Sequence, residues 1–190
     1  LAFTVLAMDA GPVLAAEEVA IDPNIKAPEL LEELFGRGAD LLVRELGSVW
    51  TGEAARRAVE QDPARVTHTA KITKEEAQLD FSLPARQLHD KVRAFAGWPG
   101  TEAELQTVDS QGSSATVKLK IITTEVGPTS DLPSDPNEVT FVNGAFNIAC
   151  GNSTVLKVIE VQPPGKKPME AKAFNNGLKA SKKRLFKVIA

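Results

Sequence analysis

The chain has 190 residues, of which 43% are hydrophobic and 25% charged, with a formal net charge of −3, which is ordinary for a soluble globular protein of one or two domains. No apolar run is long enough to span a bilayer, so no membrane association is expected. A single cysteine excludes an internal disulfide framework, and two histidines without a cysteine cluster argue against a structural metal site.

Charge is distributed unevenly along the chain. Residues 1–62 hold 12 acidic and 5 basic side chains, a net charge of −7. The stretch Gln162–Lys187 holds 8 basic residues and one acidic residue, a net charge of +7. Such asymmetry predicts two bodies with different partners, and a basic body attracts polyanions.

The first 62 residues have the pattern of an α/β domain. Leu1–Ala7 is predicted to be a buried strand and Val13–Ile21 a second strand, with a break at residues 9–12 between them. Helical spacing of apolar residues predicts a helix from about Pro28 to Trp50. Two strands and one helix cannot cover both faces of an α/β sheet. Because residue 1 is not an initiator methionine, we expect the chain to be part of a longer protein whose earlier strands complete this domain.

A linker and a second domain are predicted after residue 62. Residues 63–81 are polar without a sustained period and form the predicted linker. The second domain, residues 82–190, begins with a helix capped by Ser82 and ends with a short helix and a basic tail after Pro163. Its predicted strands are residues 101–108, 116–124, 138–142, 145–150 and 155–161. Asn143-Gly144 predicts a type I′ hairpin turn, and five short strands joined by turns favour a small OB-like barrel or sandwich.

Asp9 is the candidate catalytic residue. It follows the first predicted strand, and ligands of open α/β sheets bind outside the carboxyl ends of strands. The alternative is that Asp9 only caps a turn, a common role for aspartate. His68 and His89 come without an orienting partner, and His89 is expected at the surface or half-buried. Cys150 is expected to be a small core residue.

Four lysines are the candidate residues for binding a polyanion: Lys71 and Lys74 in the predicted linker, and Lys166 and Lys167 in the basic tail. Gathered on one surface, they would form an electrostatic footprint for nucleic acid. The low aromatic content argues against a platform for stacked bases, so contacts to phosphate are expected. The alternative is a solvated lysine face that binds nothing.

Four motifs in order along the chain resemble the methionyl-tRNA formyltransferase family, from late in its catalytic domain to its C-terminus. They are "FTVLAMDAGPVLA" (Phe3–Ala15), "KITKEEAQLDFS" (Lys71–Ser82), "VRAFAGWPGT" (Val92–Thr101) and "VQPPGKKPMEAKAFNNGL" (Val161–Leu178). The first and third look like those of plant organellar members. The resemblance implies an α/β plus β fold: the end of a Rossmann-like formyltransferase domain, a linker and an OB-like barrel that binds tRNA.

The resemblance also implies a reaction. Members transfer a formyl group from 10-formyltetrahydrofolate, without a metal, to the amino group of methionine on initiator tRNA. An asparagine, a histidine and an aspartate assist them; Asp9 matches the aspartate, whereas the other two lie upstream in the family and have no counterpart here. The 190 residues alone are therefore expected to be inactive. Lys71 and Lys74 match linker residues that meet tRNA, and Lys166 and Lys167 are expected to face the same RNA.

Two other interpretations remain open. The chain could be a non-catalytic barrel that only binds RNA, or part of a related enzyme that uses 10-formyltetrahydrofolate, such as formyltetrahydrofolate dehydrogenase. The linker sequence and the basic tail favour the tRNA enzyme. A monomer is expected, located in a mitochondrion or plastid by the plant-like resemblance, or alternatively in a bacterial-type cytoplasm.

Overall fold

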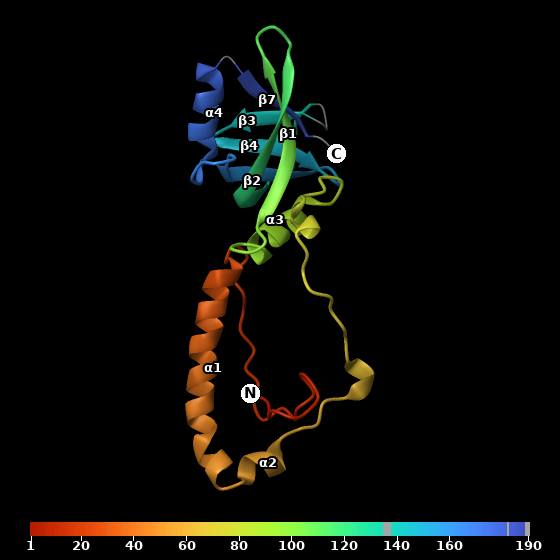
Figure 1. Cartoon of the computed structure of the whole chain (residues 1–190), viewed down its shortest axis with the longest axis vertical. Helices are drawn as coiled ribbons and strands as arrows, with labels where there is room; N and C mark the ends of the chain where they lie inside the picture. Colours follow the sequence, from red (N-terminus) through yellow and green to blue (C-terminus); the bar gives the residue numbers. More distant parts are fainter. Residues whose placement is uncertain (135–137, 182, 189–190) are drawn as a thin grey trace. The chain divides into compact units, whose positions relative to one another are not determined.

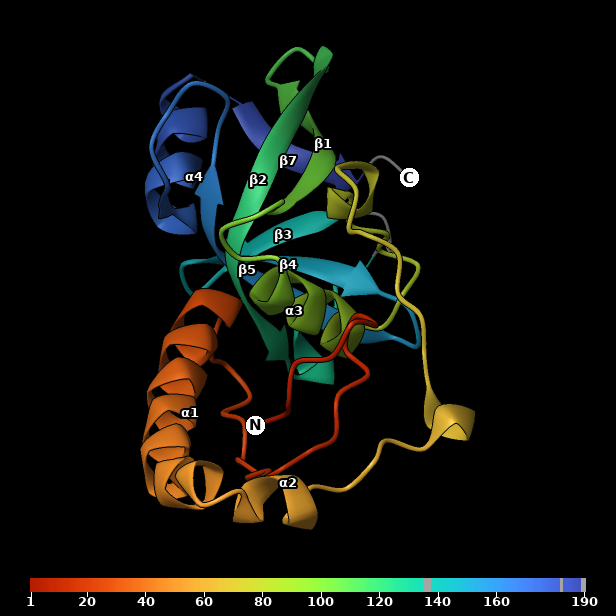
Figure 2. The ribbon, with the colours of Figure 1, turned by 60° about the horizontal axis from the view of Figure 1, so that its bottom comes forward.

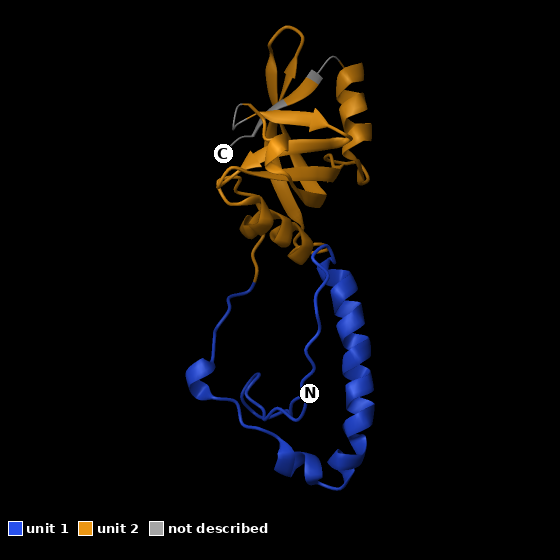
Figure 3. Cartoon of the chain, turned by 180° about the vertical axis from the view of Figure 1, so that it is seen from behind, with its two compact units in different colours: residues 1–71 blue, residues 72–190 orange. Residues whose placement is uncertain are grey.

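The computed structural model of the chain describes residues 1–134, 138–181 and 183–188. The chain divides into two compact units, Leu1–Lys71 and Ile72–Ala190, coloured separately in Figure 3. Each unit is described by itself. The boundary falls inside the predicted linker, so residues 63–81 are shared between the two units.

Unit 1, residues 1–71, is built around one long helix, α1 (Ala27–Trp50), shown in Figure 1. Its first turn contains Pro28, whose fixed φ suits the start of a helix, and the Lys26 backbone N–H donates to Glu29 Oε2 at 3.3 Å. The helix ends at Trp50, Thr51 is its C-cap, and Gly52 adopts a left-handed φ of 74°. The predicted helix is confirmed.

No residue of α1 is buried. Among its large apolar side chains, Phe35 is 72% exposed and Trp50 is 77% exposed. The helix nevertheless has the apolar spacing from which it was predicted, which is typical of a helix with one buried face. Its sequence is therefore suited to a burial that unit 1 does not itself provide.

The two strands predicted in the first 21 residues are wrong as predicted. Within 1–71 this region forms only isolated bridges, between Ala2 and Val13 and between Val13 and Val59. An extended segment becomes a strand only when a neighbour continues the hydrogen-bond ladder, and Leu1–Ala7 is mostly exposed. The backbone of Gly11 lies close to Phe3, where a Cβ would lie 1.6 Å from the Phe3 carbonyl oxygen, so only glycine fits this turn.

The segment after α1 is less irregular than predicted. It contains a short helix, α2 (Glu53–Arg57), and single 3₁₀ turns η1 (Pro63–Arg65) and η2 (Glu75–Ala77). The Arg57 guanidinium forms an ion pair with Glu45 and ties α2 to α1. Hydrogen bonds from Ser48 and Arg57 lower the pKa of the Glu45 carboxyl.

Unit 2, residues 72–190, is a nearly closed antiparallel sheet of barrel type (Figure 2). Its strands are β1 (Thr101–Asp109), β2 (Ser114–Gly127), β3 (Val139–Val142), β4 (Ala145–Cys150), β5 (Thr154–Gln162), β6 (Met169–Glu170) and β7 (Lys183–Val188). They are ordered β3-β4-β5-β2-β1-β7, with β6 paired to β5. The helices are α3 (Ala85–Ala94) and α4 (Ala171–Ala180), with a 3₁₀ turn, η3 (Thr129–Asp131).

Alternation of side chains builds the core of the barrel. In β1 and β2, Ala103, Leu105, Leu119 and Ile121 point inward and are at most 2% exposed. Helix α3 adds Leu88, which is fully buried, and packs against β2 and β5. The five strands predicted here are confirmed, and β2 extends further at both ends than predicted.

Turn chemistry closes the β3–β4 hairpin as predicted. Asn143 has φ 51° and Gly144 has φ 87°, which is the positive pair that a type I′ turn requires. Val139 pairs with Ile148 and Val142 pairs with Ala145, so two residues, Asn143 and Gly144, connect the paired strands. A local dipeptide thus fixes the pairing of two strands.

Four details of unit 2 correct the sequence-based predictions. The residue that caps α3 is Pro84, whereas the Ser82 backbone N–H donates to Asp80 in the preceding turn. His89 is 2% exposed, with its Nδ1 3.0 Å from Thr124 Oγ1. Leu79, in the predicted linker, is 3% exposed and belongs to the core. The basic tail includes β7, which pairs with β1.

Candidate nucleic-acid interface

A cation-lined groove lies on unit 2 where β1, β2 and the end of β5 meet. Its volume is about 280 Å³. The groove is lined by side chains of β1 and β2 and by the turn that follows β5: Glu102, Lys118, Lys120, Gln162, Pro163, Pro164 and Gly165. We call this feature the lysine groove.

The two lysines of the groove point outward because of strand alternation. In the sequence "VKLKI", Leu119 and Ile121 are buried, so Lys118 and Lys120 stand on the outer face of β2. Lys118 Nζ lies 2.5 Å from Glu102 Oε1 across the strand pair. That hydrogen bond, with the charge of the carboxylate, raises the pKa of Lys118. Both lysines are exposed.

The turn after β5 holds Lys166 and Lys167 beside this groove. The Lys166 backbone N–H donates to the Pro163 carbonyl at 3.1 Å, and Gln162 Nε2 donates to the Lys166 carbonyl at 2.7 Å. Gly165 adopts φ 69° within this turn. Because Gln162 is paired with Lys120 across β5 and β2, the turn begins at the lysine groove. The structure therefore brings both predicted tail lysines, which are exposed, to the same surface as Lys120.

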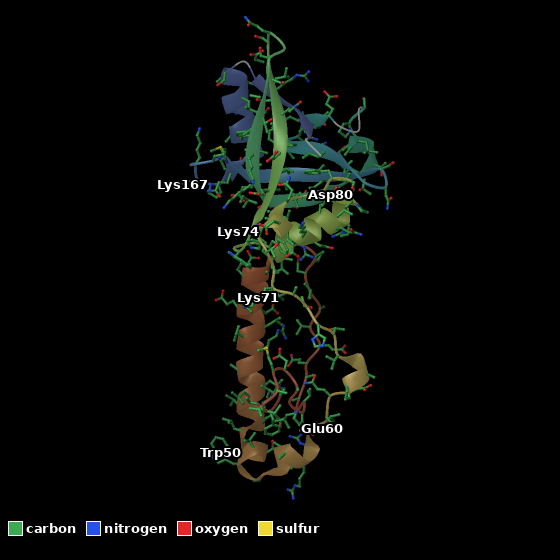
Figure 4. All side chains as sticks on the ribbon, turned by 45° about the vertical axis from the view of Figure 1, so that its right-hand side comes forward. Trp50, Glu60, Lys71, Lys74, Asp80 and Lys167 are labelled. Atoms are coloured by element: carbon green, nitrogen blue, oxygen red, sulfur yellow. The ribbon has the colours of Figure 1, made fainter. Side chains whose placement is uncertain are left out.

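Lys74 lies near the same end of the barrel. Lys74 comes directly before η2. Four residues later, Gln78 forms a bridge with Glu102, and the Leu79 N–H donates to the Glu102 carbonyl at 2.9 Å. Glu102 lines the lysine groove, so the segment that follows Lys74 meets the barrel there. In the view of Figure 4, Lys74 and Lys167 both lie on the left-hand side of unit 2. Lys71 ends unit 1 and is exposed.

Asp9 lies in unit 1, at the turn that the sequence predicted. It is exposed and has φ 55°, and its carbonyl oxygen accepts a hydrogen bond from Gln61 Nε2 at 2.8 Å. The same Nε2 donates to the Gly11 carbonyl at 2.8 Å, so Gln61 fastens this turn through its backbone. Within unit 1, no hydrogen bond or ion pair engages the Asp9 carboxylate. Both interpretations of Asp9, catalytic and turn-forming, stay predictions.

Cys150 is a buried thiol of the barrel core. Burial raises the pKa of the Cys150 thiol to about 12, so the nucleophilic thiolate is scarce at neutral pH. Cys150 is 8% exposed and belongs to the core, as predicted. No group of three or more potential metal ligands occurs in the described ranges.

Across residues 1–134, 138–181 and 183–188, no helix combines the length and the apolar character needed to cross a membrane.

Comparison with known proteins identifies the barrel. Residues 71–179 match the family described as "Formyl transferase, C-terminal domain". The chain belongs to this family. The match begins at the boundary between the two units and includes all four lysines predicted from the sequence.

The relatives of this formyl transferase family member resemble it beyond the barrel. Proteins named methionyl-tRNA formyltransferase from Brucella anthropi, Brucella canis and Brucella abortus are each 34% identical to it over 175 residues. The aligned region covers 92% of this chain and 53% of each relative, so the chain spans about half the length of these relatives. The resemblance drawn from the four sequence motifs is confirmed.

Sequence reasoning missed Lys118 and Lys120. Their signal was present, since a polar residue at every second position of an apolar strand marks its outer face. The pairing of Lys120 with Gln162, which brings β2 to the turn of Lys166 and Lys167, depends on two segments far apart in the sequence. Local patterns could therefore show that the lysines are exposed, but not that they gather.

Proposed function

We propose that this chain serves the transfer of a formyl group from 10-formyltetrahydrofolate to the amino group of methionine on initiator tRNA. The observation that carries the proposal is the 34% identity, along 92% of the chain, to proteins named methionyl-tRNA formyltransferase. In this proposal unit 2 holds the tRNA. Unit 1 belongs to the Rossmann-like α/β domain in which the formyl group is transferred, joined to unit 2 by linker residues.

The lysine groove supports a role in binding the tRNA backbone. Lys118, Lys120, Lys166 and Lys167 are exposed cations at one end of the barrel, and the latter two stand on a turn fixed by hydrogen bonds. Each phosphate that a lysine neutralises releases counterions, which favours binding at low salt. Contacts of this kind position an RNA without reading its sequence. Lys74 and Lys71 are also exposed, and in this proposal each contacts the tRNA backbone.

Asp9 has a defined role in this proposal. An aspartate at the end of a strand would orient a histidine and support its positive charge, while the histidine handles the protons of the attacking amine. The asparagine and the histidine that complete this set in the family would come from outside residues 1–190. The exposed carboxylate of Asp9 and the turn held by Gln61 are compatible with such a partner.

The experiment that tests the activity is a chimaera. Residues 1–190 replace the aligned region of the Brucella anthropi relative, and formylation of methionyl initiator tRNA is measured with 10-formyltetrahydrofolate as donor. We expect formyl-methionyl-tRNA to accumulate, and we expect the chimaera to bind the tRNA as tightly as the Brucella anthropi relative does. A folded chimaera that binds tRNA without formylating it would favour the RNA-binding module. Formylation of a free small-molecule acceptor instead of tRNA would favour the related folate enzyme.

A further inference from the structure

A second groove of unit 2 lies between the two end strands of the sheet. Strands β3 and β7 are the ends of the strand order and are not paired with each other, and α4 lies beside β4 and β7 (Figures 1 and 2). The groove has a volume of about 300 Å³. It is lined by Glu138, Val139, Thr140, Phe141, Phe146, Asn175, Lys179, Arg184 and Leu185. It shares no residue with the lysine groove, and we call it the end-strand groove.

A buried amide in this groove lacks a partner. Asn175 is 4% exposed, and its Nδ2 has no hydrogen-bond acceptor among the described residues. Burying a polar group without a partner destabilises a protein, so native structures nearly always satisfy such groups. An acceptor carried by a ligand would satisfy this donor.

The other walls of the groove restrict what that ligand can be. Phe141 is half-buried and packs edge-on against Phe146, with ring centroids 5.1 Å apart. Lys179 is an exposed cation at the end of α4, and Arg184 forms an ion pair with Glu138 at 3.4 Å. The groove thus combines an aromatic wall, an amide donor, the Lys179 cation and the Arg184–Glu138 ion pair. A planar ligand that carries hydrogen-bond acceptors and a negative charge matches the ring, the amide and Lys179.

We propose that the end-strand groove binds one unpaired nucleotide of an RNA. The base would stack on Phe141 and accept a hydrogen bond from Asn175 Nδ2, and its phosphate would face Lys179 and Arg184. Proteins read RNA mainly at unpaired nucleotides, whose bases can stack on aromatic side chains and bond along their edges. The volume is at the small end of ligand sites, which suits one nucleotide better than a large cofactor. This inference rests on the proposed function, because the RNA would be the tRNA that unit 2 holds.

A substitution at Asn175 separates a binding role from a structural one. Asn175→Leu removes the unsatisfied donor with little change in volume, so the melting temperature should stay the same or rise. The affinity of the 190-residue protein for initiator tRNA should fall about fivefold to tenfold, the effect of one lost hydrogen bond. The salt dependence of binding should not change, because no charge is lost. Asn176→Leu, at the exposed neighbour on α4, is the matched control and should bind as the unmodified protein does.

Lys179→Ala tests the phosphate side of the groove. It should lower the slope of log affinity against log salt by about 0.7 to 0.9, the effect of one lost phosphate contact. Lys172→Ala, on the same helix but outside the groove, is its control. If Asn175→Leu and Lys179→Ala both bind like the unmodified protein, the nucleotide site is overturned, whereas tRNA binding by unit 2 stands.

A probe without tRNA keeps the two proposals distinguishable. The 190-residue protein is titrated with the four nucleoside monophosphates, and the side-chain amide signals of Asn175 are followed by NMR. At least one nucleotide should shift these signals, whereas ribose 5-phosphate, which lacks a base, should not. If tRNA does not bind but a nucleotide shifts Asn175, the proposed function fails and the site stands, as a site for free nucleotides. If no nucleotide shifts Asn175, the site is overturned.

Discussion

Removing Lys166 and Lys167 together should change how the binding of tRNA depends on salt. Neither side chain is needed to form the turn, because Gln162 bonds to the carbonyl of residue 166 and the N–H of that residue bonds to Pro163. Alanine at both positions therefore removes two charges and keeps the turn. The variant should melt at the same temperature as the unmodified protein, so any loss of affinity reflects lost contacts.

The magnitude follows from counterion release. Six phosphate contacts, one from each lysine of the proposed tRNA surface (Lys71, Lys74, Lys118, Lys120, Lys166 and Lys167), give a slope of log affinity against log salt of about −4.2 to −5.4. Between 50 and 200 mM salt, affinity then falls roughly 300-fold to 1,800-fold, whereas with two contacts removed it falls only about 50-fold to 150-fold. The difference in slope, about 1.4 to 1.8, is the quantity to measure.

Titration of fluorescent initiator tRNA at four or more salt concentrations gives this slope directly. An elongator tRNA should weaken by the same factor, since phosphates carry no sequence information. The control Arg56→Ala/Arg86→Ala changes the net charge equally at two exposed positions outside both the lysine groove and the turn that carries Lys166 and Lys167. An unchanged slope in Lys166→Ala/Lys167→Ala, or an equal change in the control, would refute the placement of RNA on this turn.

Three further predictions test other parts of the molecule. In the chimaera, Asp9→Asn should lower kcat by on the order of 100-fold without changing the fold, whereas Asp40→Asn, at an exposed position on α1, should not. Gly151→Ala should lower the free energy of unfolding of unit 2 by about 2 kcal/mol or more, seen in a urea titration, because its Cβ would lie 2.0 Å from the Ser82 carbonyl oxygen. The raised pKa of Cys150, about 12, means that folding favours the neutral thiol, so this contribution to stability is complete below pH 9 and is lost as the pH rises toward 12. Between pH 9 and pH 12, the free energy of unfolding of Cys150→Ala should therefore fall less than that of the unmodified protein. An equal fall would contradict the raised pKa of Cys150.

Elements set by local patterns could be predicted from the sequence. The five barrel strands alternate apolar and polar residues, and Asn143-Gly144 supplies the positive φ angles of its turn without help from distant residues. The long helix needed only its apolar spacing and Pro28. In each case the information lies within about twenty residues of chain.

Elements that depend on distant partners could not be predicted. Leu1–Ala7 has the composition of a buried strand, but its backbone meets only isolated partners in unit 1. His89 looked like a surface residue on a polar helix, yet Thr124 from β2 supplies a hydrogen-bond partner for it in the core. The lysine-rich segment that includes β7 has the composition of a solvated tail. It forms a strand because β1 offers it an edge with which to pair.

The candidate site divides in the same way. Lys166 and Lys167 could be found from charge and from their motif. Their gathering with Lys118 and Lys120 requires the pairing of β2 with β5, and the end-strand groove requires the approach of α4 to strands from both ends of the sheet. Neither is readable from local sequence.

The pairing of β7 with β1 has a consequence for synthesis of the protein. Residues 183–188 leave the ribosome after every other strand of the barrel, yet they cover an edge of β1, which is made early. Until then β1 presents unpaired backbone groups, the condition under which strands join the wrong neighbour. The nascent barrel is therefore most vulnerable to aggregation before residues 183–188 are made, and substitutions that slow the docking of β7 should reduce soluble yield more than they reduce the stability of the folded protein.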